Sequence, residues 1–308
     1  MPRVGDQGLP WVSRSGTARR VHGWLRRQAL TPLPRLPARG RRIVPKTRSK
    51  TAGSIPAAAA LRGAGAVRDV SESFEDLSHA LRVLLEAHAR AHRQGLLQVD
   101  RAEAVGNIEA ALAGVLNGFH SLHDALSKGK SVISLPWYET PELATILVLR
   151  NARHHNHANK IRTMYTYYVQ EARSVGSMEM YVLVDFPPED EEASTFDVYL
   201  SWEDLRNLFS LPTETTRLKK ATAEGVSEYL GVGKFREYAD YYGLGEERVF
   251  FNVVPLVVNA ARVLVPQIKH LVTPRSLEAE VYLTLFETAS RSVVERPEVH
   301  CGPIAFMP

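Results

Sequence analysis

The stretch DRAEAVGNIEAALAGVLNGFHSLHDAL, residues 100–126, decides the fold class of this chain. Its apolar residues recur every three or four positions, which places them on one face of an α-helix. They are Val105, Ile108, Leu112, Val115, Phe119, Leu122 and Leu126. Asp100 followed by Glu103 is a capping-box pair that predicts where this helix begins. A long helix with one apolar face has to bury it against other helices, so the stretch predicts a helical bundle.

Two neighbouring segments predict the partner helices. Upstream, Ser73 is expected to cap a helix with an apolar stripe of its own. That stripe comprises Phe74, Leu77, Leu81, Leu84 and His88. Downstream, Thr140 is expected to cap a helix with Pro141 at its first position, where a missing N–H costs nothing. We expect this third helix to run to about residue 172, so the predicted bundle covers residues 70–172.

The remaining sequence predicts a small β-hairpin and additional C-terminal helices, within a fold that stays mainly α. Residues 178–186 and 195–201 alternate like strands on either side of the acidic residues 189–192, which we expect at the hairpin tip. Ser201 with Asp204 predicts the start of a short helix.

Further helices are predicted near residues 213–230, 233–242, 246–272 and 276–295, with Pro255 kinking the third of these. The span 175–295 is either a separate module or continuous with the bundle. Residues 296–308 are expected to form an irregular tail.

Residues 1–66 are predicted to be a disordered basic segment. The first 60 residues hold 11 Arg and 2 Lys against the single acid Asp6, a net charge of about +12. The tetrapeptide Gly53-Ser54-Ile55-Pro56 can be encoded by a sequence that resembles the T-arm of transfer-RNA genes. We therefore hypothesise that the start is mis-assigned and lies downstream of residue 60. The gene would then sit beside a transfer-RNA gene, where mobile elements often integrate.

Composition narrows the class of protein. The 308 residues are 44% hydrophobic and 23% charged, as expected for a globular chain. A single cysteine, Cys301, excludes an internal disulfide framework and a cysteine-rich zinc site. The most apolar stretch, Val249 to Ile268, contains Arg262 and is not expected to enter a membrane. We expect a cytoplasmic protein without a membrane partner.

A polar break in the third predicted helix is the best candidate for a functional site. It reads RNARHHNH from Arg150 to His157. Arginine holds phosphate oxygens in a planar fork, and histidine can accept and return a proton near neutral pH. Asn151 can orient either group or hold a ribose hydroxyl. This set suits cleavage of an RNA phosphodiester by its own 2′-hydroxyl, with no metal and no other cofactor.

The segment Arg150-Asn151-x-x-x-His155 resembles the R-N-x-x-x-H motif of the HEPN superfamily. The resemblance covers about residues 70–172 and implies a HEPN-like helical bundle. It also implies a metal-independent endoribonuclease of a toxin or phage-defence type, with Arg150 and His155 as the catalytic pair. The implied partners are RNA, a second copy in a homodimer, and an antitoxin. One departure is the position of the motif, because about half of this chain follows it.

The identity of the base is open between two histidines. His155 matches the motif form, whereas His157 matches a six-residue spacing. On an ideal helix His157 lies on the face of Arg150, and His155 is rotated from it by about 140°. His154 joins Asn151 as a supporting candidate. His154 and His157 could also chelate a metal, but no third ligand is evident nearby in the sequence.

Three further basic residues are candidates for contacting an RNA backbone. They are Arg153, Lys160 and Arg162. The alternative to all of these roles is structural: a polar break in a helix can be a satisfied buried network or a subunit contact. In that case the protein is a non-catalytic helical protein that binds a partner or nucleic acid through the patch Arg150–His157.

Overall fold

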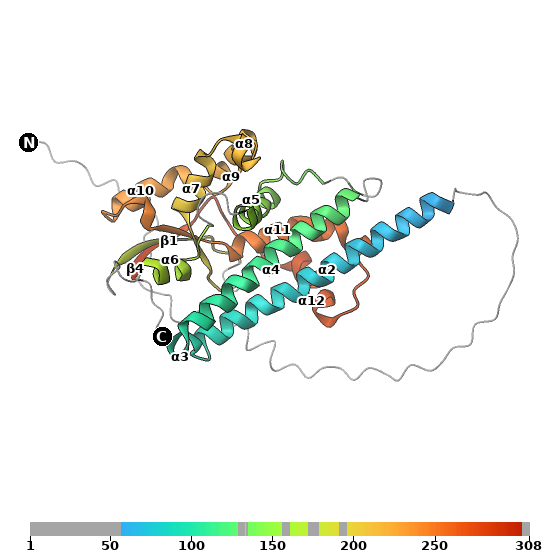
Figure 1. The fold of residues 1–308 in the computed structure, drawn as a ribbon, viewed down its shortest axis with the longest axis horizontal. Helices are drawn as coiled ribbons and strands as arrows, with labels where there is room; N and C mark the ends of the chain where they lie inside the picture. Colours follow the sequence, from blue (N-terminus) through green and yellow to red (C-terminus); the bar gives the residue numbers. More distant parts are fainter. Residues whose placement is uncertain are drawn as a thin grey trace, which may run out of the picture.

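The computed structural model describes residues 57–128, 133, 135–155, 161–171, 179–190 and 196–303, with backbone only at 57–68, 154–155 and 168–171 (Figure 1). The fold is mainly helical and contains a four-stranded sheet. The hypotheses for residues 1–56 lie outside the described residues. None of the described helices combines the length and the apolarity needed to cross a bilayer.

The two longest helices, α2 (Ala57–His92) and α4 (Arg101–Lys128), pack side by side and are joined through α3 (Leu96–Val99) (Figure 1). The predicted apolar stripe of α4 is buried along its whole length. The predicted cap is also present, because the Glu103 N–H donates to Asp100 Oδ1 at 2.9 Å. At Gly118 an added Cβ would lie 2.9 Å from Leu77 Cα, so the glycine allows the two helices to approach closely.

The start of the first helix was predicted wrongly. Helix α2 begins at Ala57, so Ser73 lies inside it, and residues 57–66 are helical instead of disordered. Residues 57–60 are four consecutive alanines, and alanine has the highest helix propensity. The amphipathic pattern that starts near Ser73 therefore lies inside the helix and does not mark its beginning.

The third predicted helix is interrupted. Helix α5 (Pro141–His155) begins at the predicted proline and packs against α4 and α11 (Val254–Ile268). Residues 161 and 162 lie outside any helix, and a separate helix, α6 (Met164–Glu171), follows. The interruption is made by distant partners: Arg162 N–H donates to Asp204, and Thr163 forms a β-bridge with Leu200. Tertiary hydrogen bonds here override a helical pattern.

The sheet has the order β2-β3-β1-β4, and the predicted hairpin is absent. The two expected strands exist as β1 (Met180–Asp185) and β2 (Tyr199–Ser201), but β3 (Val249–Asn252) lies between them. Strand β3 is parallel to β1 and antiparallel to β2. All four β3 residues are buried, and such a continuous apolar run cannot be told from a buried helix by periodicity. That is why residues 246–272 were predicted as one helix.

Three further predictions differ from the structure. Pro255 lies in the first turn of α11 and does not kink it. The tail expected to be irregular contains β4 (Glu298–Pro303), which pairs antiparallel with all six residues of β1. The acidic segment after β1 is not a hairpin tip, because the Glu189 N–H donates to the Arg291 carbonyl at 2.7 Å. Strand β4 and the position of Glu189 each depend on a partner far away in the sequence.

The C-terminal helices surround the sheet and the end of the bundle. Ser201 caps α7 (Trp202–Ser210) as predicted, with its Oγ accepting the Asp204 N–H at 3.3 Å. The helix predicted at 213–230 is split at Arg217. The remaining helical elements are α8 (Thr213–Thr216), α9 (Lys220–Tyr229), α10 (Phe235–Tyr241), α12 (Leu277–Thr288) and the short 3-10 turns Val232–Lys234, Glu246–Arg248 and Lys269–Leu271.

The core joins the helices to one face of the sheet. Val182 and Val184 of β1 pack into a cluster that also contains residues of α2, α4, α5 and α11. On the other face, Tyr181 packs with Tyr167 of α6. Helix α6 therefore covers this face of the sheet through Tyr167, while its Tyr165 belongs to the main core cluster. The packed helices place the end of α5 between α4 and the α7–α9 segment.

Candidate functional site

Arg150 lies near the end of α5 and is held by two neutral amides. Its Nε donates to Asn117 Oδ1 of α4 at 3.2 Å, and its Nη1 donates to Asn151 Oδ1 at 3.1 Å. Within the part of the chain that the structure describes, no carboxylate forms an ion pair with Arg150. Amide oxygens orient a guanidinium without cancelling its charge. Arg150 therefore keeps a fixed direction and a full positive charge.

A cavity of about 420 Å³ lies beside Arg150. Helix α4 contributes His120, helix α5 contributes residues 148 and 150–152, and the α7–α9 segment closes the other side. The cationic lining residues are Arg150, Arg217 and Lys219, and no aspartate or glutamate is among the described residues that line the cavity. Thr216 and Thr222 add hydroxyl groups. A cavity lined in this way is suited to an anion with several oxygens.

The break between α8 and α9 brings two of these cations to the cavity. Arg217 ends α8 with a φ of 57°, a left-handed conformation that is uncommon for a residue with a side chain. Its N–H donates to the Thr213 carbonyl at 2.7 Å, which closes the short helix. Lys219 precedes the first residue of α9. Sequence reasoning missed both residues, because it treated 213–230 as one continuous helix.

His120 was also missed, although the sequence carries a signal for it. Asn117, His120 and Asp124 recur at spacings of three and four residues, which puts them on one face of α4 beside its apolar stripe. Asn117 holds Arg150, and His120 lines the cavity. His120 Nδ1 lies 3.5 Å from Asp124 Oδ2. A polar stripe next to an apolar stripe indicates a second contact surface on the same helix.

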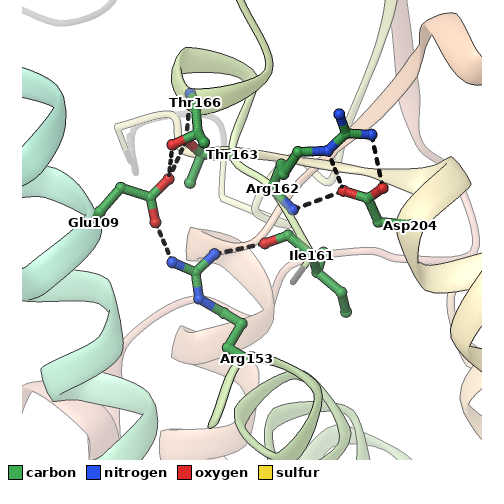
Figure 2. Close-up of polar contacts among 7 residues, drawn as sticks. All are labelled: Glu109, Arg153, Ile161, Arg162, Thr163, Thr166 and Asp204. Atoms are coloured by element: carbon green, nitrogen blue, oxygen red, sulfur yellow. Dashed lines mark hydrogen bonds and ion pairs between the residues drawn. The ribbon is translucent and has the colours of Figure 1, made fainter. Parts of the chain in front are cut away.

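Arg153 occupies a different environment, which Figure 2 shows. Its Nη1 donates to the Ile161 carbonyl at 2.6 Å, and its Nη2 forms an ion pair with Glu109 of α4. Glu109 also accepts hydrogen bonds from the hydroxyls of Thr163 and Thr166. Only 13% of the Arg153 side chain is exposed. Arg153 therefore connects α4, α5 and the segment before α6, and its predicted contact with RNA stays a prediction.

The electrostatics of Glu109 fit this structural role. Burial raises the pKa of the Glu109 carboxyl. The Arg153 charge and the two threonine hydrogen bonds lower this pKa by more than burial raises it, so the pKa in the folded protein lies below the ordinary value. The carboxylate therefore stays ionised at neutral pH. Its charge and its acceptor sites are satisfied inside the protein.

Arg162 is the second predicted RNA-binding residue that the structure places inside the fold. Its Nε and Nη2 donate to the two oxygens of Asp204, each at 2.8 Å, and its backbone N–H donates to the same carboxylate at 2.8 Å (Figure 2). The guanidinium also lies 4.9 Å from the centre of the Tyr167 ring. The hydrogen bond to Asp204 raises the pKa of Arg162. The Asp204 side chain is completely buried, so this pair fastens the start of α7 to the segment before α6.

The other predicted residues are placed only in part. His154 and His155 are the last two residues of α5, with backbone alone described. His157 and Lys160 lie outside the described residues. The described part of α5 ends at His155, and residues 161 and 162 are not helical. The choice between His155 and His157 stays a prediction.

Comparison with known proteins gives no match: no family model fits the chain, and no curated protein or solved structure is similar to it. The candidate function therefore depends on the chemistry of the cavity and on the motif at Arg150.

Proposed function

We propose that the cavity beside Arg150 binds a phosphate group of RNA, and that the protein is a metal-independent endoribonuclease. The observation that carries this proposal is the Arg150 guanidinium, held by Asn117 and Asn151 at the wall of a cavity with two further cations. None of the described carboxylates pairs with this guanidinium, so its charge is available to an anionic ligand. A phosphodiester does so with oxygens that match the guanidinium fork.

Local charge is essential for this ligand, because the sequence after residue 60 has 33 acidic and 25 basic residues. A net acidic body repels a polyanion, so binding has to occur at a basic site of limited extent. Arg217 and Lys219 lie on the wall opposite α5 and extend the positive potential across the cavity. Tyr138, 46% exposed, also lines the cavity and can stack against a base next to the bound phosphate.

The proposed reaction is a transesterification within the RNA. A histidine accepts the proton of the ribose 2′-hydroxyl, and the oxygen attacks the adjacent phosphorus. Arg150 stabilises the negative charge that develops on the phosphorane oxygens. The bond to the 5′-oxygen of the next nucleotide then breaks, and that oxygen takes up a proton. The products carry a 2′,3′-cyclic phosphate and a 5′-hydroxyl.

Three histidines are candidates for the base: His157 through its six-residue spacing from Arg150, and His155 and His120 on the following grounds. His155 occupies the histidine position of the R-N-x-x-x-H pattern, five residues after Arg150. His120 is the histidine that lines the cavity together with Arg150. Separate alanine variants distinguish them, since loss of a general base slows the chemical step about a hundredfold to ten-thousandfold. The variant with the intact base should cleave at nearly the wild-type rate.

The resemblance to HEPN proteins extends this proposal to assembly and setting. Arg150 and Asn151 of the motif lie on α5, which packs against α4, and α4 in turn packs against α2. We propose a homodimer in which two copies of the motif region meet, acting as a toxin or in phage defence, with an antitoxin as a further partner. Light scattering at micromolar concentration should give the dimer mass, and a monomer mass would contradict this part.

The test uses the purified chain and a single-stranded RNA labelled at one end. We expect cleavage in the presence of EDTA, with 2′,3′-cyclic phosphate on the upstream fragment. Arg150→Ala should bind RNA more weakly and cleave it at least about a hundredfold more slowly. If RNA binds at the cavity but no cyclic phosphate forms, the second reading holds: a non-catalytic protein that binds nucleic acid through the same residues.

A further inference from the structure

Three potential metal ligands lie together on α4, at the edge of the cavity. They are His120, His123 and Asp124, and their ligating atoms all lie within 4.8 Å of one another. The helix itself brings them together, because positions i, i+3 and i+4 share one face. His123 Nδ1 is 3.2 Å from Asp124 Oδ1, and His120 Nδ1 is 3.5 Å from Asp124 Oδ2. The carboxylate therefore lies within reach of both rings.

The two separations from Asp124, one to each of its oxygens, are close to those around a tetrahedral metal ion, while the three ligating atoms as a set lie within 4.8 Å of one another. With metal–ligand bonds of about 2.0–2.2 Å, neighbouring ligand atoms lie roughly 3.3–3.6 Å apart. Two imidazole nitrogens and one carboxylate oxygen form a borderline donor set that favours zinc-like ions over magnesium or calcium. Three protein ligands leave a fourth position for water or an anion.

The surroundings hold one ligand in place and leave another accessible. The His123 ring packs edge-on against Trp137, with ring centres 5.2 Å apart, and Trp137 is buried. Leu122, next to His123 in α4, belongs to the core, so this part of the helix is fixed. Half of the Asp124 side chain is exposed, which allows an ion to enter from solvent. A partly pre-formed site with an open side can bind an ion without refolding.

We propose that His120, His123 and Asp124 bind one divalent transition-metal ion of the zinc type. His120 also lines the anion cavity, so an ion bound by this group would lie at the edge of that cavity. A bound ion would add positive charge beside Arg150 and tighten binding of a phosphate. This site goes beyond the proposed cleavage reaction, which needs no metal, and it does not depend on that reaction.

The test titrates the EDTA-treated full chain with Co²⁺ and then with Zn²⁺. We expect one Co²⁺ per chain with visible absorption of a four- or five-coordinate ion, which Zn²⁺ displaces. His123→Ala and Asp124→Ala should each weaken Co²⁺ binding at least tenfold. Asp124 is half exposed, so its variant should fold even if a histidine variant does not. The matched control is His79→Ala on α2, which should bind Co²⁺ like the wild type.

A second control removes His154, His155 and His157 together, because these neighbours could chelate the ion instead. Unchanged Co²⁺ binding in this triple variant supports the α4 site. The proposal is overturned if no Co²⁺ binds at micromolar concentration, or if Asp124→Ala binds it as well as the wild type. RNA cleavage in EDTA is measured separately, so either proposal can fail without the other.

Discussion

Arg150 and Arg153 lie one turn apart on the same helix, yet their environments are opposite. Arg153 is almost enclosed, and its N–H groups contact Glu109 and the Ile161 carbonyl. Arg150 lines a cavity, and its described partners are two neutral amides. The contacts of Arg153 join elements of the fold, whereas those of Arg150 leave its charge without a described carboxylate partner. On the proposed function, the first arginine stabilises the fold and the second binds a ligand.

The same contrast separates two regions of the molecule. The enclosed region comprises the pairs Arg153–Glu109 and Arg162–Asp204, in which each buried charge has an opposite charge beside it (Figure 2). The open region comprises Arg150, Arg217 and Lys219 around the cavity. We expect substitutions in the first region to reduce stability and substitutions in the second to reduce ligand binding.

The largest loss of stability should follow from Asp204→Ala. The change leaves the Arg162 guanidinium and its backbone N–H without their acceptor, at a side chain that is only 17% exposed. Removing one partner of a buried ion pair costs about 3–5 kcal/mol of unfolding free energy. Urea unfolding of the wild type and the variant measures this loss of unfolding free energy. The matched control is the neighbouring Glu203→Ala, which should lose less than about 1 kcal/mol. Equal losses in the two variants would contradict the structural role of the Arg162 pair.

Glu109→Gln should have a smaller effect of the same kind. Glutamine keeps one carbonyl acceptor but removes the charge that faces Arg153, and 22% of the Glu109 side chain remains exposed to water. We expect a loss of about 2 kcal/mol, below the full value for a completely buried pair. A cycle with Arg153→Met isolates the interaction. If the two single losses simply add in the double variant, the residues do not interact as described.

The sequence predicts the parts of this molecule that depend on local pattern. The buried stripe of α4 and the caps at Asp100 and Ser201 follow from spacing and from side chains a few residues away. The interruption after α5 could not be predicted in this way. It depends on Arg162 meeting Asp204, which is 42 residues away in the chain. Strand β3 was missed because a short apolar run in the sequence is compatible with a buried strand and also with a buried helix.

The candidate site divides along the same line. Arg150 was identifiable, because a polar residue on an apolar helical face breaks a pattern. Arg217 and Lys219 line the same cavity, but the sequence does not show this. Their place beside Arg150 depends on the packing of α9 against α5. His120 was within reach of sequence reasoning, through its spacing from Asn117 on α4. Its place beside Arg150 depends on the packing of two helices.

The pH dependence of stability sharpens the contrast further. The pKa of Glu109 is lowered in the folded protein, despite the opposing effect of burial, by Arg153 and the threonine hydroxyls. A carboxyl pKa that is lower in the folded state than in the unfolded state stabilises the fold at pH values above the unfolded-state pKa of about 4.3. This stabilisation is lost as the pH falls through the folded-state pKa. The stability difference between wild type and Glu109→Gln should therefore shrink below about pH 4. Chemical unfolding of both proteins at about pH 3.5 and about pH 7 measures this stability difference. A constant difference would contradict the assignment.

A small effect on binding should distinguish two adjacent lysines. Lys219 lines the cavity, whereas Lys220 does not. The Lys220 Nζ lies 3.5 Å from Glu224 Oε1 on the surface of α9. Lys219→Ala should weaken RNA binding about threefold to tenfold, since it removes one nearby charge. Lys220→Ala should leave binding unchanged within error. Fluorescence anisotropy at fixed salt measures both, and equal losses would mean that general charge, not the cavity, holds the RNA.

The most direct test of the Arg150 cavity compares Arg150→Ala with Arg153→Ala for both stability and RNA cleavage. We expect Arg150→Ala to keep its unfolding free energy within about 0.5 kcal/mol and to lose at least about a hundredfold in the rate of cyclic-phosphate formation. Arg153→Ala should be clearly destabilised, and its remaining folded fraction should still cleave RNA. If Arg150→Ala cleaves RNA at the wild-type rate, or if the wild type forms no cyclic phosphate, the endoribonuclease proposal is contradicted.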